Sequence, residues 1–456
     1  IFDAKIFGEG DTVHVNGWGT LLVCGMRFGG NAIKADINGN NEKDDGEPEL
    51  TSAYIIMDIT DPENPPKVLA EIALPAMGFS TVYPAVLAMR DAHSGGSTNT
   101  WYLVFGSGPA DAAGKASGRA LTHAESGQPG RLYMVDLNKL GQSSGPELYT
   151  LNDSGALTAG ANVYATLADE NSFISDPVAV DYKLDFKADV VYFGTVSGSY
   201  DTGWGGKLRR IVTDNEVTPS EWVSDSVLID LDSAHQGQPV TAAPAVGIAP
   251  NRDRWVYFGT GRFFNRNDVN NLSTAADQQS YYGIKEPYEL NEDGVKVFNW
   301  NEVERVDLVN TSFVEVLKGG ATLRDVTGKI SQGEAGFSID DEASFAKFTS
   351  HMDKQDTPGW LFDFDHLTGM ERNLGQATLL GDILIFSTYI PSEDPCVIEG
   401  TSKLYALYYR TGTAYKKSIF GEYASGDDYF ILKSIDLGRG MVLTPNLYVG
   451  RKKGSK

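Results

Sequence analysis

The chain has 456 residues, with 38 lysines and arginines against 61 aspartates and glutamates, so its formal net charge is −23. This excess of negative charge repels phosphates, and we expect neither nucleic acid nor an anionic membrane surface as a partner. Hydrophobic residues make up 41% and aromatic residues 11% of the chain, enough for a large core, which excludes a largely disordered protein.

Short runs rich in valine, isoleucine, tyrosine and phenylalanine recur along the chain, bounded by glycine, proline, asparagine and aspartate. This pattern is typical of β-strands. In chain order the predicted strands are residues 20–23, 53–58, 101–105, 131–136, 190–193, 255–258, 383–388 and 403–408. Helical periodicity is limited to residues 265–277 and 342–350. The sequence therefore predicts an all-β fold.

Several strands share one arrangement, in which an apolar run such as "YLVFGSG" or "VVYFGTVSG" stops in a small glycine turn and a second strand follows. Paired strands repeated in this way are typical of propeller blades. About seven blades would average ~65 residues, more than the ~40–50 of common blade repeats. We therefore expect insertions at residues 31–50, 109–130, 200–206 and 288–356. No linker divides the chain, so we predict a single propeller domain over residues 1–456, closed by an apolar strand within residues 441–449.

A series of phrases in fixed order, among them "VYFGTGRF", "IPSEDPC" and "GTSKLYAL", resembles the conserved C-terminal propeller of the PilC/PilY family. This family comprises the type IV pilus tip-associated adhesins and assembly factors. The resemblance runs from about residue 18 to residue 411. It implies a modified β-propeller, related in shape to quinoprotein dehydrogenases, and an N-terminal adhesive region that would precede Ile1.

The resemblance also implies a function. The family's propeller supports extension of type IV pili against retraction, and calcium in one of its loops modulates that balance. The expected partners are minor pilins and the pilus fibre, with a host or abiotic surface reached through the N-terminal region. The expected location is the bacterial cell surface, the pilus tip, the outer membrane or the periplasm. No run of ~18 apolar residues is present, so no membrane span is expected.

The loop "DINGNNEKDDGE" has the spacing of a calcium-binding EF-hand loop, in which alternate residues turn oxygen atoms toward one cation. Counted from position one, the ligands at positions one, three, five, seven, nine and twelve are Asp36, Asn38, Asn40, Glu42 (through its carbonyl), Asp44 and Glu47. Position six is Asn41 instead of the usual glycine, and asparagine tolerates the left-handed conformation better than most residues. The alternative is a solvated acidic insertion.

A second loop, "DYKLDFKAD", lies where the resemblance places the family's own calcium motif. It keeps Asp181, Asp185 and Asp189 but has Lys183 at position three, and an ammonium group cannot be a calcium ligand. Either the loop has become a plain turn, or the Lys183 ammonium lies among the three carboxylates and takes the place of the ion. We favour the second hypothesis because clustered carboxylates otherwise repel one another.

Two other classes of function are considered. Quinoprotein dehydrogenases are enzymes, but their vicinal cysteine disulfide is missing because Cys24 and Cys396 are not adjacent. A generic calcium-binding surface adhesin is the other alternative. No catalytic or cofactor-binding motif is found, so we expect no enzymatic activity. Asp363 and Asp365 beside His366 are interpreted as the polar face of a strand.

The histidines and the cysteines are expected to have structural roles. The histidines show no metal-ligand spacing and are predicted to be surface or loop residues: His14, His93, His123, His235, His351 and His366. Cys24 lies within the apolar run of residues 21–24 and is predicted to be a buried thiol, with pairing to Cys396 left open.

Overall fold

The computed structural model describes residues 1–42, 49–90, 99–140, 148–151, 157–160, 164–214, 216–217, 219–232, 237–269, 278–325, 343–364, 371–392, 394 and 399–446. The chain divides into two compact units. Unit 1 comprises Ile1–Ala243 and Phe264–Asn267, and unit 2 comprises Pro244–Phe263 and Asp268–Lys456. The prediction of one domain over the whole chain stays a prediction.

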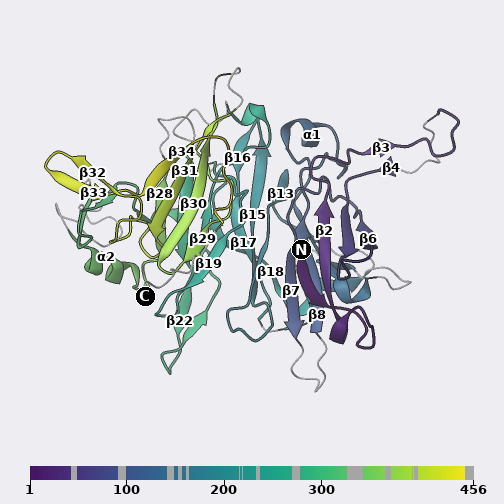
Figure 1. Ribbon diagram of the computed structural model, residues 1–456, viewed down its shortest axis with the longest axis horizontal. Coiled ribbons are helices and arrows are strands. Elements are labelled where there is room, and N and C mark those ends of the chain that lie inside the picture. Colours follow the sequence, from purple (N-terminus) through teal and green to yellow (C-terminus); the bar gives the residue numbers. More distant parts are fainter. Residues whose placement is uncertain are drawn as a thin grey trace. The chain divides into compact units, whose positions relative to one another are not determined.

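Unit 1 contains three large sheets (Figure 1). The first has the order β1 (Phe2–Lys5), β2 (Trp18–Gly25), β5 (Tyr54–Asp58), β6 (Lys67–Ile72). The second has the order β11 (Leu157–Gly160), β10 (Leu148–Leu151), β9 (Arg131–Asp136), β8 (Asn99–Gly106), β7 (Ala85–Arg90), and β12 (Tyr164–Thr166) also pairs with β9. The third has the order β13 (Ser172–Ile174), β15 (Val190–Ser199), β17 (Lys207–Val212), β18 (Val223–Asp230), and β14 (Val178–Val180) and β16 (Gly203–Gly205) also pair with β15.

Unit 2 contains two large sheets. One has the order β19 (Ala245–Ile248), β20 (Arg254–Gly259), β21 (Ser280–Lys285), β28 (Gly359–Asp363), β24 (Val309–Asn310). The other has the order β29 (Thr378–Leu380), β30 (Ile383–Ile390), β31 (Thr401–Tyr408), β34 (Ser434–Arg439). Among the described strands, every pairing is antiparallel except that of β24 with β28.

Smaller elements add to these large sheets, and several of them fall within the predicted insertions. They are the pairs β3 (Ile33–Lys34) with β4 (Glu49–Leu50), β22 (Tyr288–Leu290) with β23 (Lys296–Phe298) and β32 (Glu422–Ser425) with β33 (Asp428–Ile431), and the sheet β25 (Val314–Val316), β26 (Thr322–Asp325), β27 (Ala343–Ser344). The helices are α1 (Arg119–His123) and α2 (Phe345–Met352). Short 3₁₀ helices are η1 (Val15–Gly17), η2 (Leu137–Lys139), η3 (Pro219–Glu221), η5 (Arg266–Val269) and η7 (Arg305–Asp307).

All eight strands predicted from the sequence are confirmed, as β2, β5, β8, β9, β15, β20, β30 and β31. The helical pattern at residues 342–350 corresponds to α2, which begins at Phe345. The pattern at residues 265–277 corresponds to the single turn η5, and residues 270–277 lie outside the described part of the chain.

Two predictions are wrong, and a third is tested only in part. Residues 441–443, one candidate for the closing strand, do not form a strand, and the last described strand is β34, which pairs with β31. Residues 447–449, the other candidate, lie outside the described part, so closure through them stays a prediction. Cys24 is an exposed free thiol, because the inward positions of β2 are Gly19 and Leu21 and the opposite alternation carries Cys24 outward. His351 is 5% exposed in the helix α2, with Phe348 and Met352 buried on the same helix.

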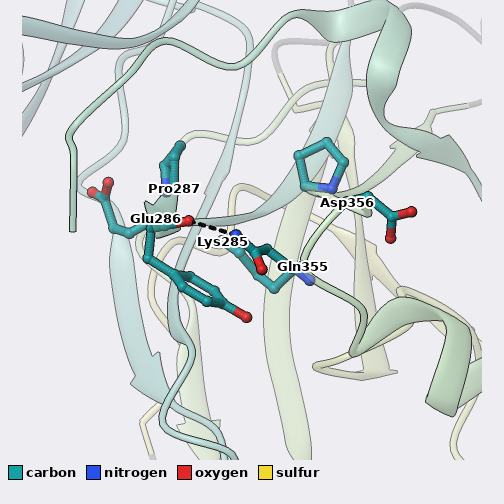
Figure 2. A pocket seen from close by; sticks show the side chains of 7 residues that line it. Lys285, Glu286, Pro287, Gln355 and Asp356 are labelled. Carbon is teal, nitrogen blue, oxygen red and sulfur yellow. Dashed lines mark hydrogen bonds between the residues drawn. The ribbon is translucent and has the colours of Figure 1, made fainter. Parts of the chain in front are cut away.

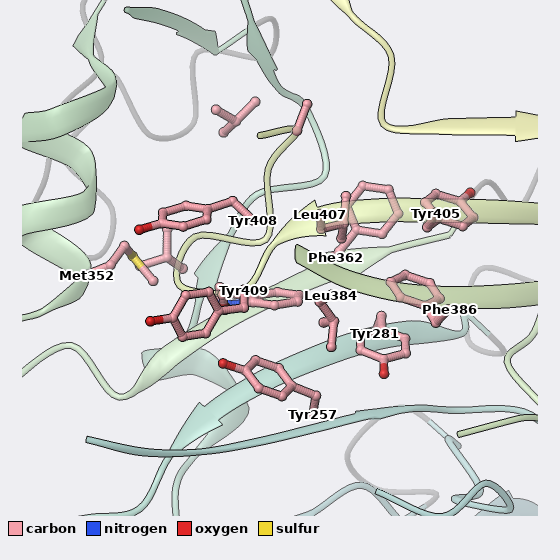
Figure 3. Packing of buried hydrophobic residues seen from close by; sticks show 14 of the residues in the cluster. Tyr257, Tyr281, Met352, Phe362, Leu384, Phe386, Tyr405, Leu407, Tyr408 and Tyr409 are labelled. Atoms are coloured by element: carbon pink, nitrogen blue, oxygen red, sulfur yellow. The ribbon is translucent and has the colours of Figure 1, made fainter. Parts of the chain in front are cut away.

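Aromatic side chains fill the core of unit 2. Tyr281 of β21 stacks on Phe386 of β30 with ring centroids 3.8 Å apart, and Phe386 stacks on Tyr405 of β31 at 5.0 Å (Figure 3). Trp360 of β28 is fully buried, and its indole N–H donates a hydrogen bond to the Tyr409 carbonyl (2.9 Å). Aromatic stacking therefore joins the two large sheets of this unit.

Candidate calcium loops

The first candidate loop follows β3 and is closed by its own side chains. The Asp36 carboxylate accepts hydrogen bonds from the backbone amides of Gly39 (2.6 Å) and Asn41 (2.7 Å). Asn40 accepts one from the Glu42 amide (2.7 Å). These contacts wind the chain tightly around Asp36, and a carboxylate that accepts amide hydrogen bonds keeps lone pairs for a cation.

The backbone of this loop is left-handed at two positions. Gly39, at position four, has φ +78°, and Asn41, at position six, has φ +65°. The asparagine therefore adopts the left-handed conformation for which glycine is usual. Asn38 accepts a hydrogen bond from the Asn40 amide (2.9 Å). The last two predicted ligands, Asp44 and Glu47, lie outside the described residues.

The second candidate loop joins β14 to β15 and is wound in the same way. The Asp181 carboxylate accepts hydrogen bonds from the amides of Phe186 (2.8 Å) and Asp185 (3.3 Å). The Asp185 carboxylate accepts one from the Lys187 amide (3.1 Å). Positions four and six again have positive φ, +56° at Leu184 and +67° at Phe186. The two loops thus share one backbone form at two places in the chain.

The end of the second loop is fastened by Asp189. Its buried carboxylate accepts hydrogen bonds from the amides of Tyr182 (2.8 Å) and Lys183 (3.2 Å). The Lys183 ammonium lies 3.1 Å from the other oxygen of Asp189. In this contact the Lys183 ammonium neutralises part of the loop's negative charge. That the same ammonium also neutralises Asp181 and Asp185 stays a prediction.

Two residues of the second loop were not singled out from the sequence. Leu184 and Phe186 are 83% and 67% exposed, although both side chains are large and apolar. Both residues also have a left-handed backbone conformation. The left-handed conformation of Phe186 could have been predicted from the sequence. An EF-hand loop has its sharpest turn at position six, where the first loop has an asparagine and the second has Phe186. A phenylalanine at this position costs stability that glycine or asparagine would not.

Calcium ligands in these loops would come from carboxylate, amide and carbonyl oxygens. Within the described part of the chain, no group of three or more histidine, cysteine, aspartate and glutamate side chains is placed to hold a metal ion. The first loop would therefore bind calcium through Asp36 together with amide and backbone oxygens, and through the two ligands outside the described residues.

The acid/base candidate at Asp363 is part of a structural network. Its carboxylate accepts hydrogen bonds from Ser280, from the Arg305 guanidinium (2.9 Å) and from the Asn310 amide (2.9 Å). These contacts join β28 to β21, β24 and η7. Asp365 and His366 lie outside the described residues.

No family model matches this chain. In sequence it is similar to "Type IV pilus biogenesis factor PilY1" of Pseudomonas aeruginosa, from strains PAO1 and PAK. The identity is 23% over 443 residues, which cover 90% of this chain and 30% of each relative. The chain thus spans about a third of the length of the curated relatives it matches.

In structure the chain is similar to the crystal structure of the P. aeruginosa PilY1 C-terminal domain. The TM-score is 0.55 at 18% identity, over 93% of this chain and 76% of that one. The predicted resemblance to the PilC/PilY family is confirmed. The predicted all-β propeller fold is confirmed as well, while the number of blades stays a prediction. No helix of the described ranges is long and apolar enough to cross a membrane.

Proposed function

We propose that this chain is the propeller part of a type IV pilus biogenesis factor. The observation that carries this proposal is the similarity to PilY1, which extends over 90% of the chain. In this role the propeller acts without catalysis and contacts the pilus machinery, with minor pilins and the pilus fibre as partners. Its place is the cell surface, the pilus tip, the outer membrane or the periplasm.

Adhesion belongs to the same proposal. The chain spans 30% of its curated relatives, so a host or abiotic surface would be contacted through the part of PilY1-like proteins that this chain does not match. The propeller would then support fibre extension while the other part binds the surface.

We further propose that calcium modulates this role through the loop at residues 36–47. The ligand spacing, the left-handed Asn41 and the tight winding around Asp36 support the assignment. A divalent cation would cancel the repulsion between the acidic side chains of the loop and fix its conformation. In the second loop, the Lys183 ammonium would supply the positive charge instead.

Two experiments test these proposals separately. Deletion of the gene in its own host, followed by complementation with the wild-type gene, should abolish and restore surface pili; unchanged pili after deletion would contradict the pilus role. Metal analysis of the purified protein, before and after chelation, tests calcium. A protein without calcium that still restores pili would contradict the calcium proposal alone.

A further inference from the structure

Unit 2 has two adjacent hollows near the end of β21. Their volumes are about 500 and 630 Å³. They share the wall residues Pro287, Gln355, Asp356 and Pro358, and so form two halves of one groove. Figure 2 shows Lys285, Glu286, Pro287, Gln355 and Asp356 gathered around the smaller half.

The groove is held by contacts between segments that are distant in the sequence. The Gln355 side chain donates a hydrogen bond to the Tyr288 carbonyl (3.0 Å), which ties the segment after α2 to β22. The Lys285 ammonium is buried at the end of β21 and donates to the carbonyls of Met352 (3.0 Å) and Lys354. These bonds fix the shape of the hollow before a ligand binds, so little conformational entropy is lost on binding.

The charge of the groove is negative where it meets solvent. The carboxylates of Glu302, Asp307 and Asp356 belong to exposed residues that line it. Its lysine, Lys285, is only 3% exposed and is directed to backbone carbonyls. A cationic ligand would therefore meet three exposed carboxylates, while an anion would be repelled.

The walls between these charges are apolar. Pro287 and Pro358 belong to the shared wall, the Tyr288 residue lines the smaller half, and Val306 of η7 lines the larger one. Val306 is 89% exposed, so its side chain is accessible to a ligand in this half of the groove. Long aliphatic stems that end in a cation, as in lysine and arginine, match proline and valine walls with a carboxylate rim.

We propose that this groove binds a basic, extended peptide segment of a partner protein. The apolar walls would contact the stems of its lysine or arginine side chains, and Glu302, Asp307 and Asp356 would pair with their charged ends. The net charge of −23 favours the approach of such a partner at long range. The proposal does not depend on calcium or on the role in pilus assembly.

The test uses fluorescence anisotropy of a fluorescein-labelled hexa-arginine peptide with the whole chain in low salt. The variant Glu302→Gln/Asp307→Asn/Asp356→Asn should bind at least about tenfold more weakly, because three rim pairs are lost. The matched control is Glu399→Gln/Asp427→Asn/Asp436→Asn, which removes the same charge from exposed residues of unit 2 that do not line the groove. It should change the affinity by less than about threefold.

A second pair of variants tests the apolar wall. Val306→Arg places a cation in the groove and should weaken binding about tenfold, whereas Val295→Arg, at a 56% exposed residue outside the lining, should not. Equal losses in the groove variants and their controls would show diffuse charge attraction and overturn the proposal. Displacement of the peptide by spermine at the same molar concentration would overturn the assignment to a peptide, since a free polyamine would then suffice.

Discussion

The His14 imidazole lies between two carboxylates. Its Nδ1 is 3.0 Å from Asp11 and its Nε2 is 2.9 Å from Asp58, and the ring stacks on Phe7. Burial alone would lower the pKa of His14, but the bonds to Asp11 and Asp58 outweigh burial and raise this pKa above its usual 6.5. The contact with the His14 ring, together with hydrogen bonds from the backbone amides of Val13 and His14, lowers the pKa of Asp11 to about 2. When it is protonated, the imidazolium joins the loop after β1 to the end of β5.

This arrangement predicts a pH-dependent stability. A raised histidine pKa in the folded state stabilises the protein fully below pH 6.5, and the contribution is lost as the pH rises through the folded-state pKa. The variant His14→Gln should therefore be less stable than the wild type by about 1–2 kcal/mol at pH 6. Thermal melts of both proteins from pH 6 to pH 9 should show this gap narrowing. A gap that widens with rising pH would contradict a charged His14.

The left-handed Phe186 predicts a stabilising substitution. It has φ +67° and a 67% exposed side chain, so Phe186→Gly should remove backbone strain and lose little packing. We expect a gain of up to about 1 kcal/mol in the free energy of unfolding, measured by urea titration. Phe313→Gly is the control, because Phe313 is 50% exposed but does not have positive φ. A loss of stability in both variants would show that Phe186 packs more than its exposure indicates.

At the scale of the single element, the first loop predicts a calcium-dependent melting temperature. Calcium that binds only the folded state raises stability by mass action, about 2.7 kcal/mol at a hundredfold excess over Kd. The variant Asp36→Ala should lose this gain, because Asp36 occupies the first ligand position and also holds the amides of Gly39 and Asn41. Calorimetry with calcium and with chelator measures the difference. An unchanged calcium response in the variant would place the ion elsewhere.

In the second loop, Lys183 is predicted to stabilise the protein in the absence of calcium. Lys183→Ala removes the cation beside the buried Asp189 carboxylate and should lower stability by up to about 1 kcal/mol in chelator, a small effect because Lys183 is 43% exposed. Lys183→Asp restores an acidic residue at position three and should create a second calcium site. Titration calorimetry that finds no additional ion in Lys183→Asp would contradict the view that a lysine has replaced calcium.

Strands were predictable because their signal is local. The run at residues 131–136 has the same bounds as β9, since its apolar side chains are bounded by residues that favour turns. The direction of individual side chains was less predictable. A four-residue apolar run does not reveal which alternate positions face inward, and Cys24 was therefore wrongly expected to be buried. Likewise, the lone His351 gives no sign that its helix packs that face against the core.

At the scale of the whole chain, both candidate loops belong to unit 1. Calcium should therefore slow hydrogen exchange in the peptides that contain residues 36–42 and in their neighbours within unit 1. Peptides from the aromatic core of unit 2, such as those of β21 and β30, serve as the internal control. Mass spectrometry with calcium and with chelator makes the comparison. Slowing confined to unit 2 would contradict the loop assignment.

The candidate groove shows what a single sequence does not reveal at this scale. Its lining comes from residues 285–288, 301–307 and 355–358, which carry no common motif. The candidate calcium loops could be predicted because all of their proposed ligands lie in one short segment, whereas the groove exists only where three segments meet. An exposed valine such as Val306 is visible in the structure but has no distinct pattern in the sequence.

The parallel pairing of β24 with β28 has an evolutionary consequence. Asn310 of β24 pairs with Leu361 of β28. The chain therefore leaves the sheet after β24 and returns to it in the neighbouring strand, about 5 Å away. The excursion between them is anchored to the core by the fully buried Phe348 and Met352 of α2. Residues added or lost elsewhere in this excursion would leave the strand order unchanged. Related chains could thus diverge in the segment at residues 355–358, and with it in their choice of partner, while keeping the same propeller scaffold.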